Sequence, residues 1–218
     1  MEQVLQFDGN LLIGIQQSLN ADWLTPIMKF ITLFGEHGYF AIALCLFLLL
    51  FKKTRRLGII CSLSLLLAFI CCNVILKNVV GRARPWEVYD AVHPYLPHPG
   101  DSSFPSGHSS NTMGPAWGMF LATMPGKKDT GGGLVKSYDD VPCLGWRGVG
   151  VDARTMHKIA IGMVILALLV GISRLYLGMH YPSDVIVGLL LGMISATIAN
   201  YAVGKYEEKH GIIGKVKD

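Results

Sequence analysis

The stretch LGIICSLSLLLAFICCNVIL, residues 57–76, contains twenty residues and no charge. A helix of about 20 apolar residues spans the hydrocarbon core of a bilayer. Four further charge-free runs lie at residues 38–51, 109–126, 159–173 and 185–204. Any one of the shorter runs would also suit a buried core helix. Five of them in one chain predict an all-α fold, a polytopic transmembrane helical bundle.

The composition supports this fold class, because 51% of the residues are hydrophobic and only 16% are charged. A soluble domain carries about 25% charged residues. We expect one domain, 1–218, whose residues 1–35 form an amphipathic N-terminal segment with helices over 8–19 and 22–34 and breaks at Asn20 and Gly35. This segment either lies at the membrane interface or enters the membrane, which gives five to six spans. The other spans are expected at about residues 37–52, 57–77, 106–125, 157–175 and 182–203.

The basic residues predict the orientation of the chain in the cell membrane. Counting spans puts 14 of the 19 lysines and arginines on one side, in residues 52–56, 127–158 and 205–217. The positive-inside rule makes that side cytoplasmic. We therefore expect a cytoplasmic loop at 126–156 and a cytoplasmic tail at 205–218. The net charge of +4 does not indicate a nucleic-acid partner.

The opposite, outer ends of the spans collect polar residues typical of an anion site. Ser106 suits the N-cap of the span that follows Pro105, and Gly107 permits a close backbone approach. The first N–H groups of such a helix are free donors, and its dipole favours an anion there. Three cations that suit phosphate oxygens lie at the same ends: Lys77, Arg84 and Arg174.

Two histidines add reactivity to this anion pocket. Asp184 lies four residues after His180 at a helix start, where a carboxylate can fix the imidazole tautomer and leave the other nitrogen nucleophilic. His108 can serve as a general acid for a leaving oxygen. No metal is required if cations and helix ends neutralise the developing charge. The five cysteines show neither metal-ligand nor disulfide spacing, so we expect no cofactor.

Each of these features has an ordinary structural interpretation. Pro-Ser-Gly is a common helix start, His-x-x-x-Asp occurs by chance, and lysine and arginine at span ends often only reach for the interface. Their collection on one face of the membrane favours a functional site over these separate explanations.

Three blocks in order carry a family resemblance: KNVVGRARP (77–85), PSGH (105–108) and SRLYLGMHYPSD (173–184). They match the patterns K-x6-R-P, PSGH and S-R-x5-H-x3-D, and the chain resembles the type 2 phosphatidic acid phosphatase superfamily over about residues 70–203. The resemblance implies a helical bundle with its active site at one end, and no metal. One departure is the loop between the second and third motifs, which is longer than in short undecaprenyl-diphosphatase-like members.

The resemblance also implies a role for each matching residue. His180 would form a phosphohistidine, Asp184 would orient it, and His108 would act as acid and then as base. The phosphoryl oxygens would be held by Lys77, Arg84, Ser106, Gly107 and Arg174. Arg82 lies outside the signature, and contact with a second phosphate or a headgroup is one interpretation of it.

The implied activity is hydrolysis of a lipid phosphate or diphosphate at the outer membrane face. Undecaprenyl diphosphate is the first substrate expected. Phosphatidylglycerol phosphate, phosphatidic acid and diacylglycerol pyrophosphate are alternatives, as is phosphotransfer to another lipid through the same phosphohistidine. A non-enzymatic anion channel or carrier is disfavoured, because no span carries a charge near its middle and the histidines would be unexplained. The sequence does not decide the oligomeric state.

Overall fold

The computed structural model describes residues 2–52, 54–124 and 153–210. All regular structure in these ranges is helical, which confirms the expected all-α class. The expected loop at 126–156 falls outside the described residues except for its last four positions, and the expected tail is described only as far as His210.

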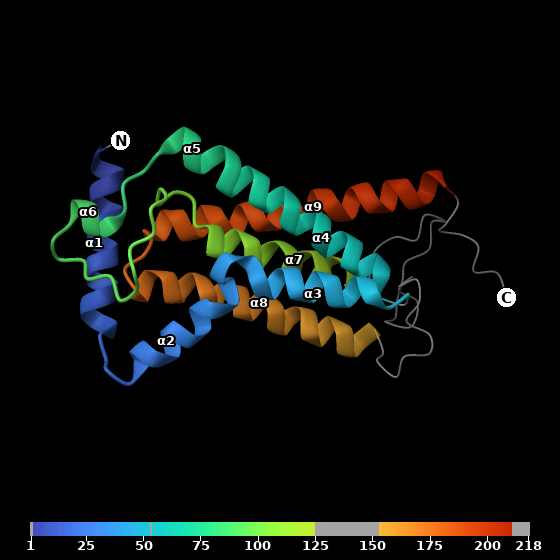
Figure 1. Cartoon of the computed structure of the whole chain (residues 1–218), viewed down its shortest axis with the longest axis horizontal. Coiled ribbons are helices and arrows are strands. Elements are labelled where there is room, and N and C mark those ends of the chain that lie inside the picture. Colours follow the sequence, from blue (N-terminus) through green and yellow to red (C-terminus); the bar gives the residue numbers. More distant parts are fainter. Residues whose placement is uncertain (1, 53, 125–152, 211–218) are drawn as a thin grey trace.

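The bundle consists of helical segments that run side by side along the long axis of the molecule (Figure 1). Four stretches are long and apolar enough to cross a membrane: Leu24–Leu50, Arg55–Val88, Arg154–Tyr176 and Pro182–Lys209. They contain α3 (Tyr39–Leu50), α4 (Arg55–Phe69) with its π-helical continuation η2 (Ile70–Leu76) and α5 (Lys77–Val80), α8 (Ala153–Tyr176) and α9 (Pro182–Lys209). The 17-residue α7 (Gly107–Thr123) lies among them. The expected number of spans is compatible with this arrangement.

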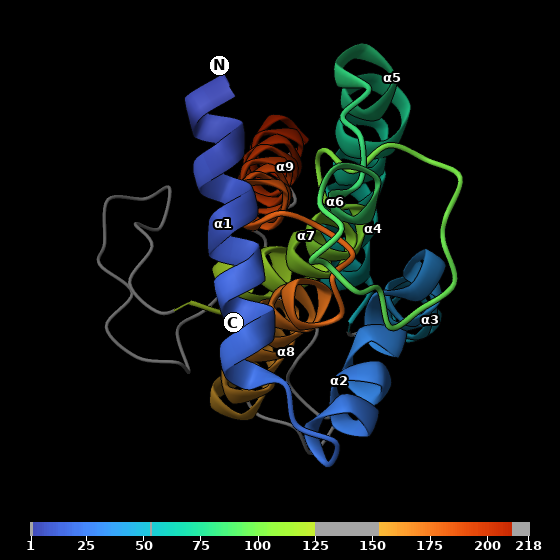
Figure 2. The ribbon, with the colours of Figure 1, turned by 90° about the vertical axis from the view of Figure 1, so that its left-hand side faces the viewer.

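The N-terminal segment divides into two parts. Helix α1 (Glu2–Leu19) ends one residue before the expected break at Asn20 and lies across one end of the bundle (Figure 2). Helix α2 (Leu24–Thr32) continues through the 3-10 turn η1 (Leu33–Gly38) into α3. The second break was expected at Gly35 but lies just after it, where Glu36 and His37 leave the helical conformation and Gly38 is left-handed (φ 71°). The short helix α6 (Pro85–Val88) lies between the spans expected at 57–77 and 106–125.

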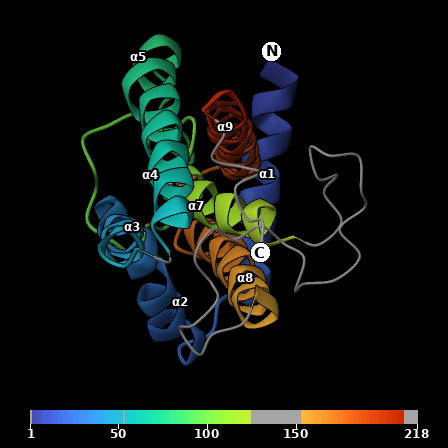
Figure 3. The same cartoon turned by 90° about the vertical axis from the view of Figure 1, so that its right-hand side faces the viewer.

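Helix α7 is the central element of the bundle. It packs against α4, α8 and α9, and end-on views show it enclosed by them (Figures 2 and 3). Lipid tails are as apolar as leucine, so membrane helices associate through close packing at small residues. At Gly192 of α9 a Cβ atom would lie 2.8 Å from the Ser110 carbonyl oxygen and 2.8 Å from the Met113 Cβ. The backbones of α7 and α9 therefore meet at a distance that only glycine allows.

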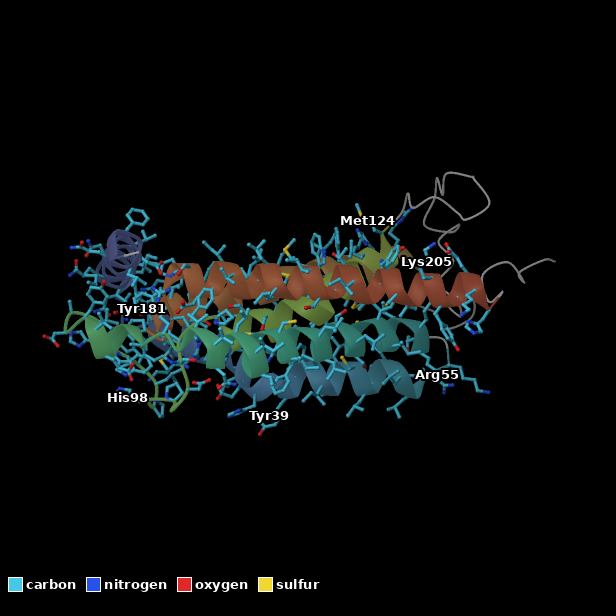
Figure 4. All side chains as sticks on the ribbon, turned by 90° about the horizontal axis from the view of Figure 1, so that it is seen from above. Tyr39, Arg55, His98, Met124, Tyr181 and Lys205 are labelled. Carbon is cyan, nitrogen blue, oxygen red and sulfur yellow. The ribbon has the colours of Figure 1, made fainter. Side chains whose placement is uncertain are left out.

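The two ends of the bundle differ in chemistry. Figure 4 shows Tyr181 and His98 at one end, with Arg55 and Lys205 at the other. The first end also carries α1, α6 and the start of α9 (Figure 1). The residues singled out as a candidate site therefore gather at the end that counting the spans had assigned to the outer side.

We expect Gly192→Ala to lower the free energy of unfolding by about 1–3 kcal/mol, because its methyl group meets backbone atoms of α7 that have no space to move. Gly162→Ala is the matched control, since nothing lies within 4 Å of a Cβ atom there. In an open helical position alanine is more favourable than glycine by about 0.5–1 kcal/mol. Thermal unfolding in detergent measures both, and equal melting temperatures would contradict the close α7–α9 packing.

Candidate active site

The N-termini of α7 and α9 are joined at the end of the bundle that α1 crosses, which we expect to be the outer end (Figure 1). Ser106 is the N-cap of α7, and its Oγ accepts from the Ser109 amide (3.4 Å). The Ser106 amide donates to the carbonyl oxygen of Asp184, in the first turn of α9 (3.0 Å). This approach requires Gly188, where a Cβ atom would lie 2.5 Å from the Ser106 carbonyl oxygen. Gly107 packs against η2, because a Cβ atom at Gly107 would lie 2.5 Å from the Oδ1 of Asn73.

His180 is buried directly before α9, and its two ring nitrogens face different groups. Nε2 lies 3.3 Å from Nη1 of Arg84. Because a guanidinium only donates, Nε2 must accept, and the ring proton of the neutral imidazole is then on Nδ1. Nδ1 lies 3.5 Å from Oδ2 of Asp184, although no hydrogen bond joins the two atoms. The carboxylate therefore faces the protonated nitrogen, and the lone pair of the ring lies on Nε2, where it accepts from Arg84.

The surroundings of His180 keep it neutral. Burial is the largest cause that lowers the pKa of His180 well below its usual value, and the positive charges of Arg84 and Arg174 lower it further. His108 and Lys77 act in the same direction, which means that the predicted histidines and cations surround one imidazole. A neutral imidazole is the form that can act as a nucleophile.

Asp184 is held in place by donors from several elements. Its Oδ2 accepts from the Tyr181 amide (2.9 Å) and from the Ser103 hydroxyl (2.5 Å). Its Oδ1 accepts from Nη1 of Arg82 (2.7 Å). The carboxylate is fully buried and satisfied by these bonds, so its position relative to His180 is fixed by the fold.

Arg82 lies under the site, which corrects the interpretation of this residue as a contact for a second phosphate or a headgroup. Only 12% of its side chain is exposed, and it bonds both Asp184 and Asp8 of α1 (2.7 Å each). Asp8 also accepts from the amide (3.0 Å) and hydroxyl (2.5 Å) of Ser183. Helix α1 is thereby attached to the start of α9 through charged groups, and the guanidinium stacks on the Tyr181 ring at 3.7 Å.

Lys77 and Arg84 both bind one carboxylate, that of Asp101. Lys77 pairs with its Oδ2 and Arg84 with its Oδ1. Arg84 is also fixed by two backbone carbonyls, those of Met179 (2.8 Å) and Asp101 (3.0 Å). Partial burial would raise the pKa of Asp101, but the hydrogen bonds and charges of Lys77 and Arg84 outweigh it and lower the pKa to about 2. Asp101 is therefore an anion at any physiological pH.

The kink before α3 supplies partners for the remaining two site residues. Nε2 of His108 lies 3.4 Å from Oε2 of Glu36. Nη1 of Arg174 donates to the Thr32 hydroxyl (3.0 Å). Among the described residues, three buried side-chain atoms lack a hydrogen-bond partner, and two belong to this site: Nε of Arg174 and Nδ1 of His180. Unpaired buried donors are costly, and a bound anion could satisfy Nε of Arg174, whereas Nδ1 of His180 faces Asp184.

Sequence reasoning missed the acidic partners Glu36, Asp101 and Asp8. Nothing in the pattern distinguished these carboxylates from others in loops and amphipathic helices. The one available signal was the break near Gly35, because a polar residue at a break within an apolar stretch needs a partner. Within residues 2–52, 54–124 and 153–210, no three histidine, cysteine, aspartate or glutamate side chains are grouped as metal ligands would be.

These features define an all-helical membrane protein whose candidate anion site lies where the N-termini of α7 and α9 meet. Residues 57–208 match the PAP2 superfamily, so the chain belongs to this family, and the resemblance carried by the three motifs is confirmed.

Two relatives and one solved structure illustrate the similarity. An undecaprenyl-diphosphatase from Sulfolobus acidocaldarius is 31% identical over 78% of this chain and 66% of its own length. A lipid A 1-phosphatase from Rhizobium etli is 26% identical over 84% of this chain and 65% of its own length. The chain thus spans slightly less than two thirds of each. A transmembrane PAP2-type phosphatidylglycerolphosphate phosphatase from Bacillus subtilis shares the fold, with a TM-score of 0.66 at 24% identity, covering 100% of this chain and 90% of that one.

We expect Arg82→Gln to lower the free energy of unfolding by about 3–5 kcal/mol, because it leaves the buried carboxylates of Asp8 and Asp184 without their cation. Lys205→Gln removes a cation from an exposed pair with Glu208 and should leave the melting temperature nearly unchanged. Thermal unfolding of both variants in detergent gives the comparison. If the two variants have the same melting temperature, Arg82 does not hold this network.

Proposed function

We propose that the chain is an integral membrane phosphatase that hydrolyses a lipid phosphate or diphosphate through a phosphohistidine at His180. The observation that carries the proposal is the orientation of this imidazole. Its Nδ1 faces a fixed carboxylate, while Nε2 faces Arg84 and the cations beside it. A buried neutral nucleophile next to cations is the arrangement that attack on a phosphoryl group requires.

The reaction then follows in two steps. Nε2 of His180 attacks phosphorus, and the bond from phosphorus to the leaving oxygen breaks while His108 donates a proton to that oxygen. His108 next takes a proton from water, whose oxygen attacks phosphorus; the phosphorus–nitrogen bond breaks, which releases inorganic phosphate and returns His180 as a neutral imidazole. Lys77, Arg84 and Arg174, together with the first amides of α7 behind Ser106 and Gly107, hold the phosphoryl oxygens. Asp184 stabilises the charge that develops on the imidazole.

The substrate proposed first is undecaprenyl diphosphate, hydrolysed to undecaprenyl phosphate. The Sulfolobus relative, whose name states this activity, supports it. The names of other similar proteins favour lipid A 1-phosphate or phosphatidylglycerol phosphate as alternatives, and phosphatidic acid remains a further candidate. Transfer of the phosphoryl group to another lipid would use the same intermediate.

The location proposed is the cell membrane, with the site on the extracytoplasmic side and residues 1–218 acting as one domain. The bias of lysine and arginine toward the opposite end supports this orientation. The candidate site lies at the end of the bundle that α1 crosses (Figure 1), so a headgroup bound there would leave its lipid tail in the bilayer.

We expect the purified chain to release inorganic phosphate from at least one lipid in a panel of these four candidates. His180→Ala should abolish release, and His108→Ala should reduce kcat by about 10²–10⁴-fold. His93→Ala is the control, because this histidine is exposed on the same face and only its backbone contacts α1. A phosphoenzyme trapped on His180 supports the intermediate.

Three results would contradict parts of this proposal. Turnover by a folded His180→Ala protein excludes the assigned nucleophile. Phosphorylated acceptor lipid in place of free phosphate indicates a transferase. No release from any lipid, combined with anion flux in liposomes, indicates a channel or carrier.

A further inference from the structure

Two of the cations around His180, Arg84 and Lys77, already hold an anion that belongs to the chain. The Asp101 carboxylate bridges them, with Oδ1 on Arg84 and Oδ2 on Lys77. The cation side chains are almost buried, with 4% of Arg84 and 10% of Lys77 exposed, whereas 50% of the Asp101 side chain is exposed. The carboxylate therefore enters the site from the solvent side and binds the cations with two oxygens, as two phosphoryl oxygens would.

A resident anion has a physical reason in the free protein. Buried cations are costly without a partner, and the cost falls when a carboxylate neutralises them. The same carboxylate becomes unfavourable once a phosphoryl group enters, because two anions would share the same two cations. Like charges this close repel each other strongly in a partly buried site.

We propose that Asp101 competes with the phosphoryl group for Lys77 and Arg84, and so sets how tightly the site holds substrate and product phosphate. This inference rests on the proposed function, since it takes both cations as phosphate ligands. Substrate binding exchanges one anion for another, and the return of Asp101 expels inorganic phosphate after hydrolysis.

The surroundings of Asp101 allow this exchange. Residues 89–106 connect α6 to α7 without a helix or strand, so a rotation of the side chain does not disrupt a regular element. Arg84 stays in place without the carboxylate, because the backbone carbonyls of Met179 and Asp101 still accept from it. Arg84 therefore keeps its position when the Asp101 carboxylate leaves.

Competition by Asp101 lowers the affinity of the site for both substrate and product, but only the substrate has further contacts that hold it. A lipid substrate is anchored in the bilayer, so contacts with its tail offset the cost of displacing Asp101. Inorganic phosphate has no such anchor and meets the same competitor. A competing state that occupies the site for about nine tenths of the time weakens apparent affinity about tenfold.

The test is a titration of Asp101→Asn with inorganic phosphate, followed by ³¹P NMR in detergent. Asparagine keeps the size of the side chain and removes its charge. We expect the dissociation constant for phosphate to fall about tenfold, with a parallel fall in KM and no increase in kcat. Asp101→Ser is measured beside it, so that a specific contact of the new amide does not decide the result.

Asp90→Asn is the matched control, because it makes the same change of charge at an exposed position of the same loop. Its dissociation constant should stay at the wild-type value. If the Asp101 variants bind phosphate as the wild type does, or more weakly, or if none of the proteins binds it, the competition does not exist. An equal gain in the Asp90 variant would show a general charge effect and would equally overturn it.

Phosphate binding and lipid hydrolysis are measured separately, so the two proposals fail separately. Tighter binding by the Asp101 variants without lipid hydrolysis by the wild type leaves the competition intact and contradicts the phosphatase. Lipid hydrolysis by the wild type, with unchanged phosphate binding in the Asp101 variants, supports the phosphatase and contradicts the competition.

Discussion

A single backbone contact organises the outer end of this molecule. The Ser106 amide donates to the Asp184 carbonyl oxygen (3.0 Å), which sets the first turns of α7 and α9 side by side. Gly188 makes the approach possible, since any Cβ atom there would collide with the carbonyl of Ser106. Because His180 lies two residues before α9, the contact also sets the position of the imidazole relative to the start of α7. The same pair of helices packs closely again at Gly192, so the register of the bundle and the geometry of the site depend on one interface.

Charges of alternating sign connect the remaining parts of the site. The order in space is Asp8, Arg82, Asp184, His180, Arg84, Asp101 and Lys77, in which acidic and basic groups alternate and the neutral imidazole lies between Asp184 and Arg84. Each group except the imidazole is neutralised by its neighbours, which makes the burial of so many charges tolerable. The imidazole needs no counterion because it carries no charge itself, and the uncharged form keeps its nitrogen reactive.

The sequence predicted the features that follow from local rules. Apolar runs predicted the helices, and three motifs predicted the residues that meet at the outer end, because each motif lies at a helix end whose side is determined by counting spans. Long-range partners could not be predicted in this way. Glu36 reaches His108 only because the chain bends between α2 and α3, and Asp8 reaches Arg82 only because α1 crosses the bundle. The position of Asp101 depends on the path of an irregular loop, and no periodicity encodes such a path.

The contact between Asp8 and Ser183 joins residues 175 positions apart. Translation completes Asp8 175 residues before Ser183. The network that holds Asp184 therefore closes only after the start of α9 has been made. Until then, Asp8 is the one carboxylate of this network that can pair with Arg82.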